Sequence, residues 1–189
     1  MRFEYYDRLG AKDRRTYRKS DAVSAIELPS HAVRALRALA KETEAALATE
    51  KPRSVSAPVK KLVSGLCEAL EAPALEVKVR ARRPRSAEGE LHGLYTRWED
   101  GTARIEVWMK TAAHAKTVKP RTFVRTLLHE VCHHLDYTVL GLADSFHTEG
   151  FFKRESSLVR ALLPAPKKKP VQLSLFSLAE SGPTRTKRS

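Results

Sequence analysis

Residues 121–140 read RTFVRTLLHEVCHHLDYTVL, and this segment decides the fold of the chain. Apolar side chains recur along it at helical spacing: Phe123, Val124, Leu127, Leu128, Val131 and Leu135. Pro120 suits the first turn of a helix, and Gly141 suits the position after its end. The segment therefore predicts a helix over about residues 121–140 with one face buried in the core.

The rest of the chain predicts an α+β fold around this helix. Helical spacing of apolar residues indicates further helices over about residues 30–51, 56–72 and 148–163. Alternation of apolar and polar residues indicates strands over 75–83 and 103–110, and 91–98 is a third candidate strand. Glu99-Asp100-Gly101 has the composition of a hairpin turn. We therefore expect a small, mostly antiparallel sheet packed on the 121–140 helix, with flanking helices.

The two ends of the chain differ from its middle. Residues 1–28 are polar, which predicts an irregular segment that packs on the domain through its scattered aromatic residues Phe3, Tyr5, Tyr6 and Tyr17. Residues 29–164 should form one domain. In residues 165–189, Pro, Ser, Lys and Arg dominate without any period, which predicts a disordered basic tail.

Net charge bears on the partners of the chain. The 189 residues include 35 Lys and Arg against 22 Asp and Glu, which gives a formal net charge of +13. Such an excess favours polyanions, nucleic acid above all, because phosphate contacts release counterions. The predicted strand 75–83 points Lys78, Arg80 and Arg82 to one side. This basic face is either a DNA track or a solvated surface.

Composition also bears on the compartment. No stretch approaches the roughly 20 apolar residues that span a bilayer, and the N-terminus lacks the apolar run of a secretory signal. Two cysteines, Cys67 and Cys132, are too few for a disulfide framework or a four-cysteine zinc site. We therefore expect a cytoplasmic protein without membrane association.

The predicted helix 121–140 contains the pattern H-E-x-x-H at residues 129–133. Residues four apart lie on one face of a helix, so the rings of His129 and His133 can converge on a single Zn²⁺. Glu130 is one step around the helix, beside the metal, where it can accept a proton from an activated water. The pattern therefore predicts a zinc hydrolase with Glu130 as its acid/base.

A catalytic zinc needs a third protein ligand. The metzincin pattern requires Gly at 136 and His at 139, and the chain has Asp136 and Val139, which excludes that class. The third ligand is therefore His147, which follows a short loop, or a glutamate, Glu149 or Glu155, from the next helix. We favour His147, because imidazole is a common zinc ligand.

Other polar residues near the motif have candidate supporting roles. Asp136 and Asp144 are either outer carboxylates that hold the ligand imidazoles or ordinary surface and capping residues. Glu155 is an outer carboxylate if it is not a ligand. His134 points about 100° away from His133 around the helix, which indicates a polar contact rather than a ligand.

The motif and the following His147-Thr148-Glu149-Gly150-Phe151 resemble the SprT-like metallopeptidases, a zincin group that includes the Spartan proteases. The resemblance covers about residues 103–163. It implies a compact zincin-like domain, zinc on His129, His133 and His147, catalysis by Glu130, and a substrate cleft lined by the strand 103–110. Many relatives carry a cysteine-rich zinc module, which two cysteines cannot build, so any DNA contact would come from basic side chains.

A short segment of the tail carries a second signal. Gln172-Leu173-Ser174-Leu175-Phe176 resembles the pentapeptide by which bacterial DNA-processing proteins bind the β sliding clamp. Leu175 and Phe176 would enter an apolar pocket of the partner while Gln172 hydrogen-bonds at its rim, and Leu173 belongs to the same binding peptide. The alternative is that residues 171–178 fold back on the domain as a short strand or helix.

These observations predict a zinc metallopeptidase that cleaves proteins. Proteins that are associated with DNA or crosslinked to it are the narrower substrate class that we expect. Two alternatives stay open. One is an adaptor that binds DNA or the sliding clamp and keeps a structural zinc site. The other is a zinc hydrolase of non-protein substrates, because H-E-x-x-H specifies the metal and the water but not the substrate.

Overall fold

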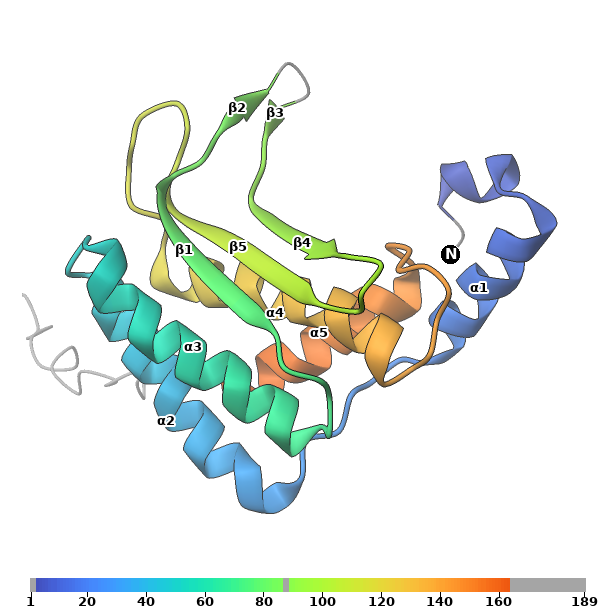
Figure 1. Cartoon of the computed structure of the whole chain (residues 1–189), viewed down its shortest axis with the longest axis horizontal. Helices are drawn as coiled ribbons and strands as arrows, with labels where there is room; N and C mark the ends of the chain where they lie inside the picture. Colours follow the sequence, from blue (N-terminus) through green and yellow to red (C-terminus); the bar gives the residue numbers. More distant parts are fainter. Residues whose placement is uncertain (1–2, 87–88, 164–189) are drawn as a thin grey trace, which may run out of the picture.

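A small sheet lies on a layer of helices in the computed structural model, which describes residues 3–86 and 89–163 (Figure 1). The helices are the 3₁₀ helix η1 (Glu4–Arg8) and the α-helices α1 (Ala11–Ala22), α2 (Ser30–Leu47), α3 (Pro52–Ala69), α4 (Pro120–Thr138) and α5 (Glu149–Leu162). The strands are β1 (Glu76–Arg82), β2 (Arg85–Ser86), β3 (Gly89–Glu90), β4 (Gly93–Arg97) and β5 (Ala103–Lys110). The fold is of the predicted α+β class.

The main sheet has the strand order β1-β5-β4. β4 and β5 are antiparallel neighbours joined through the turn at Gly101, whereas β1 runs parallel to β5. The expected mostly antiparallel sheet is therefore a mixed one. The chain leaves β1, turns back through the small β2–β3 ladder, and inserts β5 between β1 and β4, so β1 and β5 point the same way. β4 is left at an edge.

The core lies between β5 and α4. Ile105, Val107 and Met109 alternate along β5 and are fully buried. They belong to one hydrophobic cluster with the apolar face of α4, whose members are Phe123, Val124, Leu127, Leu128, Val131 and Leu135. The helix predicted from residues 121–140 is thus confirmed, and its buried face holds the metal motif against the sheet.

The second predicted helix begins earlier than expected. α3 starts at Pro52 and continues through Pro58, where we had placed its first turn. Proline suits the first turn in either case, but the buried side of α3 already includes Val55 before Pro58. Extending the helix adds this apolar contact to the core at the loss of one backbone hydrogen bond.

The prediction that the N-terminal segment is irregular is wrong, because the segment forms the helices η1 and α1. The buried side of α1 consists of Thr16, Tyr17 and Ser20 rather than aliphatic residues. The sequence of α1 therefore lacks the apolar spacing that predicts a helix. The ring centroid of Tyr17 lies 6.3 Å from that of Phe146, and the centroid of Phe3 lies 6.0 Å from that of Phe152, so the expected packing of the segment on the domain through aromatic residues is confirmed.

Two expectations concern other parts of the chain. The tail 165–189, including Gln172, Leu173, Leu175 and Phe176, lies outside the described residues. Among the helices of residues 3–86 and 89–163, none combines the length and the hydrophobicity needed to cross a membrane.

Candidate metal centre

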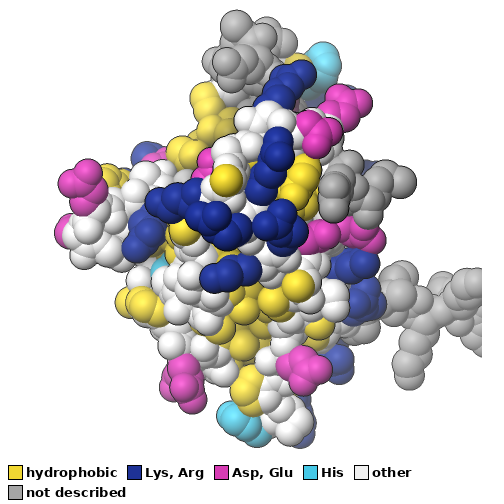
Figure 2. All heavy atoms as spheres, turned by 90° about the vertical axis from the view of Figure 1, so that its right-hand side faces the viewer, with side chains coloured by type: hydrophobic (Ala, Val, Ile, Leu, Met, Phe, Trp, Pro, Cys, Tyr) yellow, Lys and Arg dark blue, Asp and Glu magenta, His cyan; other side chains and the backbone are white. Residues whose placement is uncertain are grey.

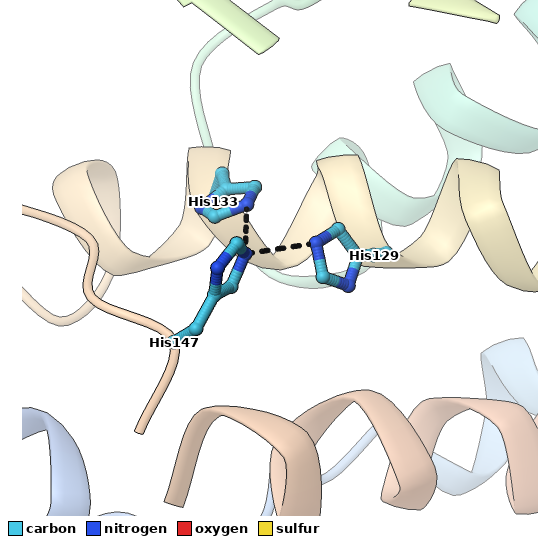
Figure 3. Close-up of side chains that lie close together, drawn as sticks. All are labelled: His129, His133 and His147. Atoms are coloured by element: carbon cyan, nitrogen blue, oxygen red, sulfur yellow. Dashed lines mark hydrogen bonds between the residues drawn. The ribbon is translucent and has the colours of Figure 1, made fainter. Parts of the chain in front are cut away.

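Three histidines converge at the surface of α4 (Figure 3). His129 and His133 come from consecutive turns of α4, and His147 reaches them from the segment that connects α4 to α5. The Nε2 atom of His147 lies 3.0 Å from Nε2 of His129 and 3.1 Å from Nε2 of His133. The three residues that the sequence predicts as ligands are therefore close enough together to bind one metal ion.

The arrangement fits zinc. Tetrahedral Zn–N bonds of about 2.0–2.1 Å put ligand nitrogens about 3.3 Å apart, close to the distances between these rings. Burial, with the nearby charges of His129 and His147, lowers the pKa of His133 to about 3. Burial also lowers the pKa of His147. Both rings are therefore neutral at neutral pH, with a lone pair free for a metal.

Glu155 does not compete for the metal but supports His129. The Nδ1 atom of His129 donates to Oε2 of Glu155 at 3.0 Å, and Nε of Arg125 donates to Oε1 at 2.5 Å. Burial opposes ionisation of Glu155, but these two hydrogen bonds outweigh it and hold the pKa of the carboxyl below its usual range. A carboxylate on Nδ1 fixes the tautomer that leaves Nε2 free for a metal.

His133 is supported through a hydroxyl. Its Nδ1 atom lies 2.7 Å from Oγ of Ser145, which donates to Oδ2 of Asp136 at 2.8 Å. Asp136 therefore acts on the ring through Ser145 and not directly. Asp144 touches neither ring; its Oδ1 accepts from the Tyr137 hydroxyl and from the Ser145 backbone amide. Its carboxylate shapes the loop that carries Ser145.

Asp136 is itself neutralised by a buried arginine. Arg154 of α5 donates to Oδ1 of Asp136 at 2.8 Å, and both side chains are fully buried. The same guanidinium donates to the backbone oxygens of Ser20 and Val23 at the end of α1. One side chain thus joins α1, α4 and α5 directly behind the metal centre.

Phe151 forms the floor of the centre. It is fully buried in the first turn of α5, and its ring centroid lies 5.0, 4.7 and 5.1 Å from those of His129, His133 and His147. An apolar ring in contact with all three imidazoles limits the positions they can take. This contact accounts for the aromatic residue four positions after His147.

Glu130 lies beside the three histidines and lines the same cleft. Its side chain is buried, which raises the pKa of the carboxyl to about 7, although the charge of His129 and the backbone amide of Tyr95 act in the opposite direction. The carboxylate occupies the space next to Gly93, where a Cβ atom would lie 2.3 Å from Oε1. A side chain at position 93 would therefore displace the Glu130 carboxylate from this position.

The cleft runs between β4 and α4. It has a volume of about 760 Å³ and is lined by the metal-centre residues and by residues 90–95. The sequence predicts that β5 lines the cleft, but β5 is the central strand, and both of its edges are paired, one with β1 and the other with β4. The edge strand β4 lines the cleft instead, and its outer edge has no strand partner in the part of the chain that the structure describes.

His134 points away from the cleft, as the helix geometry predicted. Its Nε2 atom lies 3.0 Å from the carbonyl oxygen of Pro73, and Nδ1 lies 3.2 Å from the hydroxyl of Tyr95. The Tyr95 ring also stacks on His133 with centroids 6.3 Å apart. His134 therefore makes a polar core contact that holds β4 against α4.

Sequence reasoning missed four residues of the centre: Gly93, Tyr95, Ser145 and Arg154. Each acts through a partner on another element of the fold, so no local pattern marks it. Ser145 lies inside the loop that had been considered only as a connection to His147. The close approach of Gly93 to Glu130 depends on the position of β4.

No family model, curated protein or solved structure matches the chain. The assignment of the centre therefore rests on its own geometry.

Proposed function

We propose that the protein is a zinc-dependent metallopeptidase. The observation that carries the proposal is the convergence of His129, His133 and His147 in a cleft that also holds the carboxylate of Glu130. Three imidazoles and a carboxylate beside an open cleft are the set that catalytic zinc sites use. A structural zinc would instead be closed by a fourth protein ligand.

His129, His133 and His147 would hold the zinc through their Nε2 atoms. When bound, zinc would polarise the scissile carbonyl and lower the pKa of water. Glu130 would accept the proton of the attacking water and pass it to the leaving amine nitrogen. Glu155 and Ser145 would keep the rings of His129 and His133 oriented during this transfer.

A peptide is the substrate that this cleft suits best. The cleft follows the outer edge of β4, and an extended peptide can add to such an edge through backbone hydrogen bonds. The resemblance of the motif and of His147–Phe151 to the SprT-like metallopeptidases supports the same substrate class. Proteins held on DNA are the narrower proposal, supported by the net charge of +13.

Zinc content is the first test. We expect protein purified without a metal-affinity tag to contain a single zinc per chain by elemental analysis. His147→Ala should lose most of it, whereas Glu149→Gln, which alters the rival ligand, should keep it. Glu155→Ala should weaken zinc binding about 10–100-fold, as the loss of an outer partner does. A folded wild type without zinc would contradict the proposal.

Catalysis is the second test. Glu130→Gln should keep zinc but lower hydrolysis of an unfolded, fluorescently labelled protein about 10²–10⁴-fold. Activity on small esters with none on unfolded proteins would point to the non-protein hydrolase instead. Zinc binding without any hydrolysis, together with DNA or clamp binding, would point to the adaptor.

A further inference from the structure

The solvent side of α1 carries an unusual concentration of positive charge. Lys12, Arg15, Arg18 and Lys19 are exposed within about two turns of helix, opposite its buried side, and the half-buried Arg14 lies at their edge. No carboxylate shares this side, since Asp13 and Asp21 are half-buried on the others. Figure 2 looks onto the side of the molecule where α1 lies in Figure 1 and shows Lys and Arg side chains gathered across its middle.

These cations differ from those of the sheet in having no acidic partner. On the sheet, Arg80 pairs with Glu106 at 2.9 Å and Arg104 pairs with Glu76 at 2.6 Å. Arg82 is held by the carbonyl oxygen of Ala112. In contrast, none of the five cations of α1 forms an ion pair with another residue of the described ranges. Free positive potential is therefore concentrated on α1 and not on the basic face of β1.

Two of the five side chains are held in place. Nη2 of Arg14 donates to the backbone oxygen of Asp7 at 2.7 Å, and its guanidinium lies over the ring of Tyr6. Nη1 of Arg18 donates to the hydroxyl of Tyr6 at 3.1 Å. Because Tyr6 is buried, these guanidinium groups need little ordering before they meet a ligand.

We infer that the solvent side of α1 binds the sugar–phosphate backbone of a nucleic acid. Several cations without acidic neighbours match a row of phosphates, and each contact releases counterions. An anionic membrane surface would require an apolar strip beside the charges. Apart from the cations, this side of α1 carries only the small residues Ala11 and Ala22.

The helix α1 and the neighbouring η1 contact the segment that supports the metal centre. The hydroxyl of Tyr5 in η1 donates to the backbone oxygen of His147 at 2.9 Å. Ser20 of α1 lies 3.2 Å, Oγ to Oγ1, from Thr148 at the start of α5. A nucleic acid on α1 would therefore sit on a unit in direct contact with the segment that carries His147. The inference does not require that the centre be a peptidase.

Fluorescence anisotropy with the full chain tests this inference. The probe is a fluorescein-labelled DNA duplex of about 20 base pairs and arbitrary sequence, with the same-length single strand as a second arm. The test variant is Lys12→Gln, Arg15→Gln, Lys19→Gln, which leaves Arg14 and Arg18 on Tyr6. The control is Lys41→Gln, Lys60→Gln, Lys61→Gln, which removes the same charge from the exposed sides of α2 and α3.

We expect the α1 variant to weaken binding at least about 10-fold near 0.1 M salt and to reduce the salt slope by about 2–3, whereas the control changes the affinity less than about 2-fold. The stronger of the two arms identifies the form of DNA that is bound. An equal loss in both variants would reduce the effect to net charge and overturn the inference. It would also fail if the α1 variant bound like the wild type, or if wild type bound anionic phosphatidylserine vesicles but neither form of DNA.

Discussion

Each histidine of the metal centre is held by a different kind of partner. A carboxylate holds His129, and a serine hydroxyl linked to Asp136 holds His133. The side-chain hydroxyl of Tyr5 donates to the backbone oxygen of His147 and so holds its segment. Outer partners of this kind set the tautomer and the direction of a ligand ring. The spacing of the motif is therefore necessary for the site, but the partners on Nδ1 decide where the lone pairs of His129 and His133 point.

Gly93 provides the sharpest test at the scale of single residues. In Gly93→Ala, the new Cβ atom would lie 2.3 Å from Oε1 of Glu130, so the carboxylate must move out of its place. Misplaced catalytic groups lower rates steeply, and we expect peptide hydrolysis to fall about 10²-fold. Zinc content should not change, because Gly93 touches none of the three histidines in this way.

The matched control is Gly10→Ala. A Cβ atom there meets only Oδ2 of Asp13, at the ordinary contact distance of 3.8 Å. We expect the same activity as the wild type, measured on the same labelled protein. Equal activity of Gly93→Ala and wild type would show that the position of Glu130 next to β4 is not needed for the reaction.

At the scale of elements, the arginine behind the centre joins helices that are far apart in the sequence. Arg154 contacts Asp136 of α4 and the end of α1, and the unpaired Nε is its only polar atom without a partner. Gly150 has a related function: a Cβ atom there would lie 2.6 Å from the backbone oxygens of Ser20 and Asp21. The first turn of α5 and the end of α1 can approach only without a side chain at this position.

Replacing this arginine should destabilise the whole domain. Arg154→Leu leaves Asp136 as a buried, unpaired charge, and we expect a loss of about 3–5 kcal/mol in the free energy of unfolding, measured with urea. Lys153→Gln is the control, because Lys153 forms an exposed pair with Glu149 at 2.8 Å. Such exposed pairs contribute about 0–1 kcal/mol. Similar unfolding curves for the two variants would show that the buried pair does not hold the helices together.

At the scale of the whole molecule, the two thiols report on the integrity of the core. Cys67 of α3 and Cys132 of α4 are buried in the same hydrophobic cluster. Burial raises the pKa of Cys67 to about 11, so its reactive thiolate is scarce at neutral pH. We expect neither thiol to react with a disulfide reagent in the folded protein, and both to react in denaturant.

A colorimetric thiol assay at neutral pH checks this expectation. Rapid reaction of a thiol in the native protein would show that the hydrophobic cluster around Cys67 and Cys132 opens readily. The same assay on Arg154→Leu would show whether loss of the buried ion pair loosens that core before the protein unfolds.

Local pattern predicted the elements that depend on a single repeating property. Apolar spacing identified α4, alternation identified β5, and both were confirmed within about two residues. The same approach missed α1, because its buried side is made of Thr16, Tyr17 and Ser20. It also misplaced the start of α3, because Pro58 indicated a beginning that the burial of Val55 overrides.

The sequence by itself determined the chemistry available to the molecule: two histidines and a glutamate on one helix, since helical spacing alone brings them to one face. Only the tertiary structure decided which further residues complete the site. Long-range packing brings His147 to the motif and places Glu155 and Ser145 against His129 and His133. It also makes β4, and not β5, the strand that lines the cleft. The physical reason is that packing and hydrogen bonds between distant segments depend on three-dimensional distance, which sequence spacing encodes only within one helix or strand.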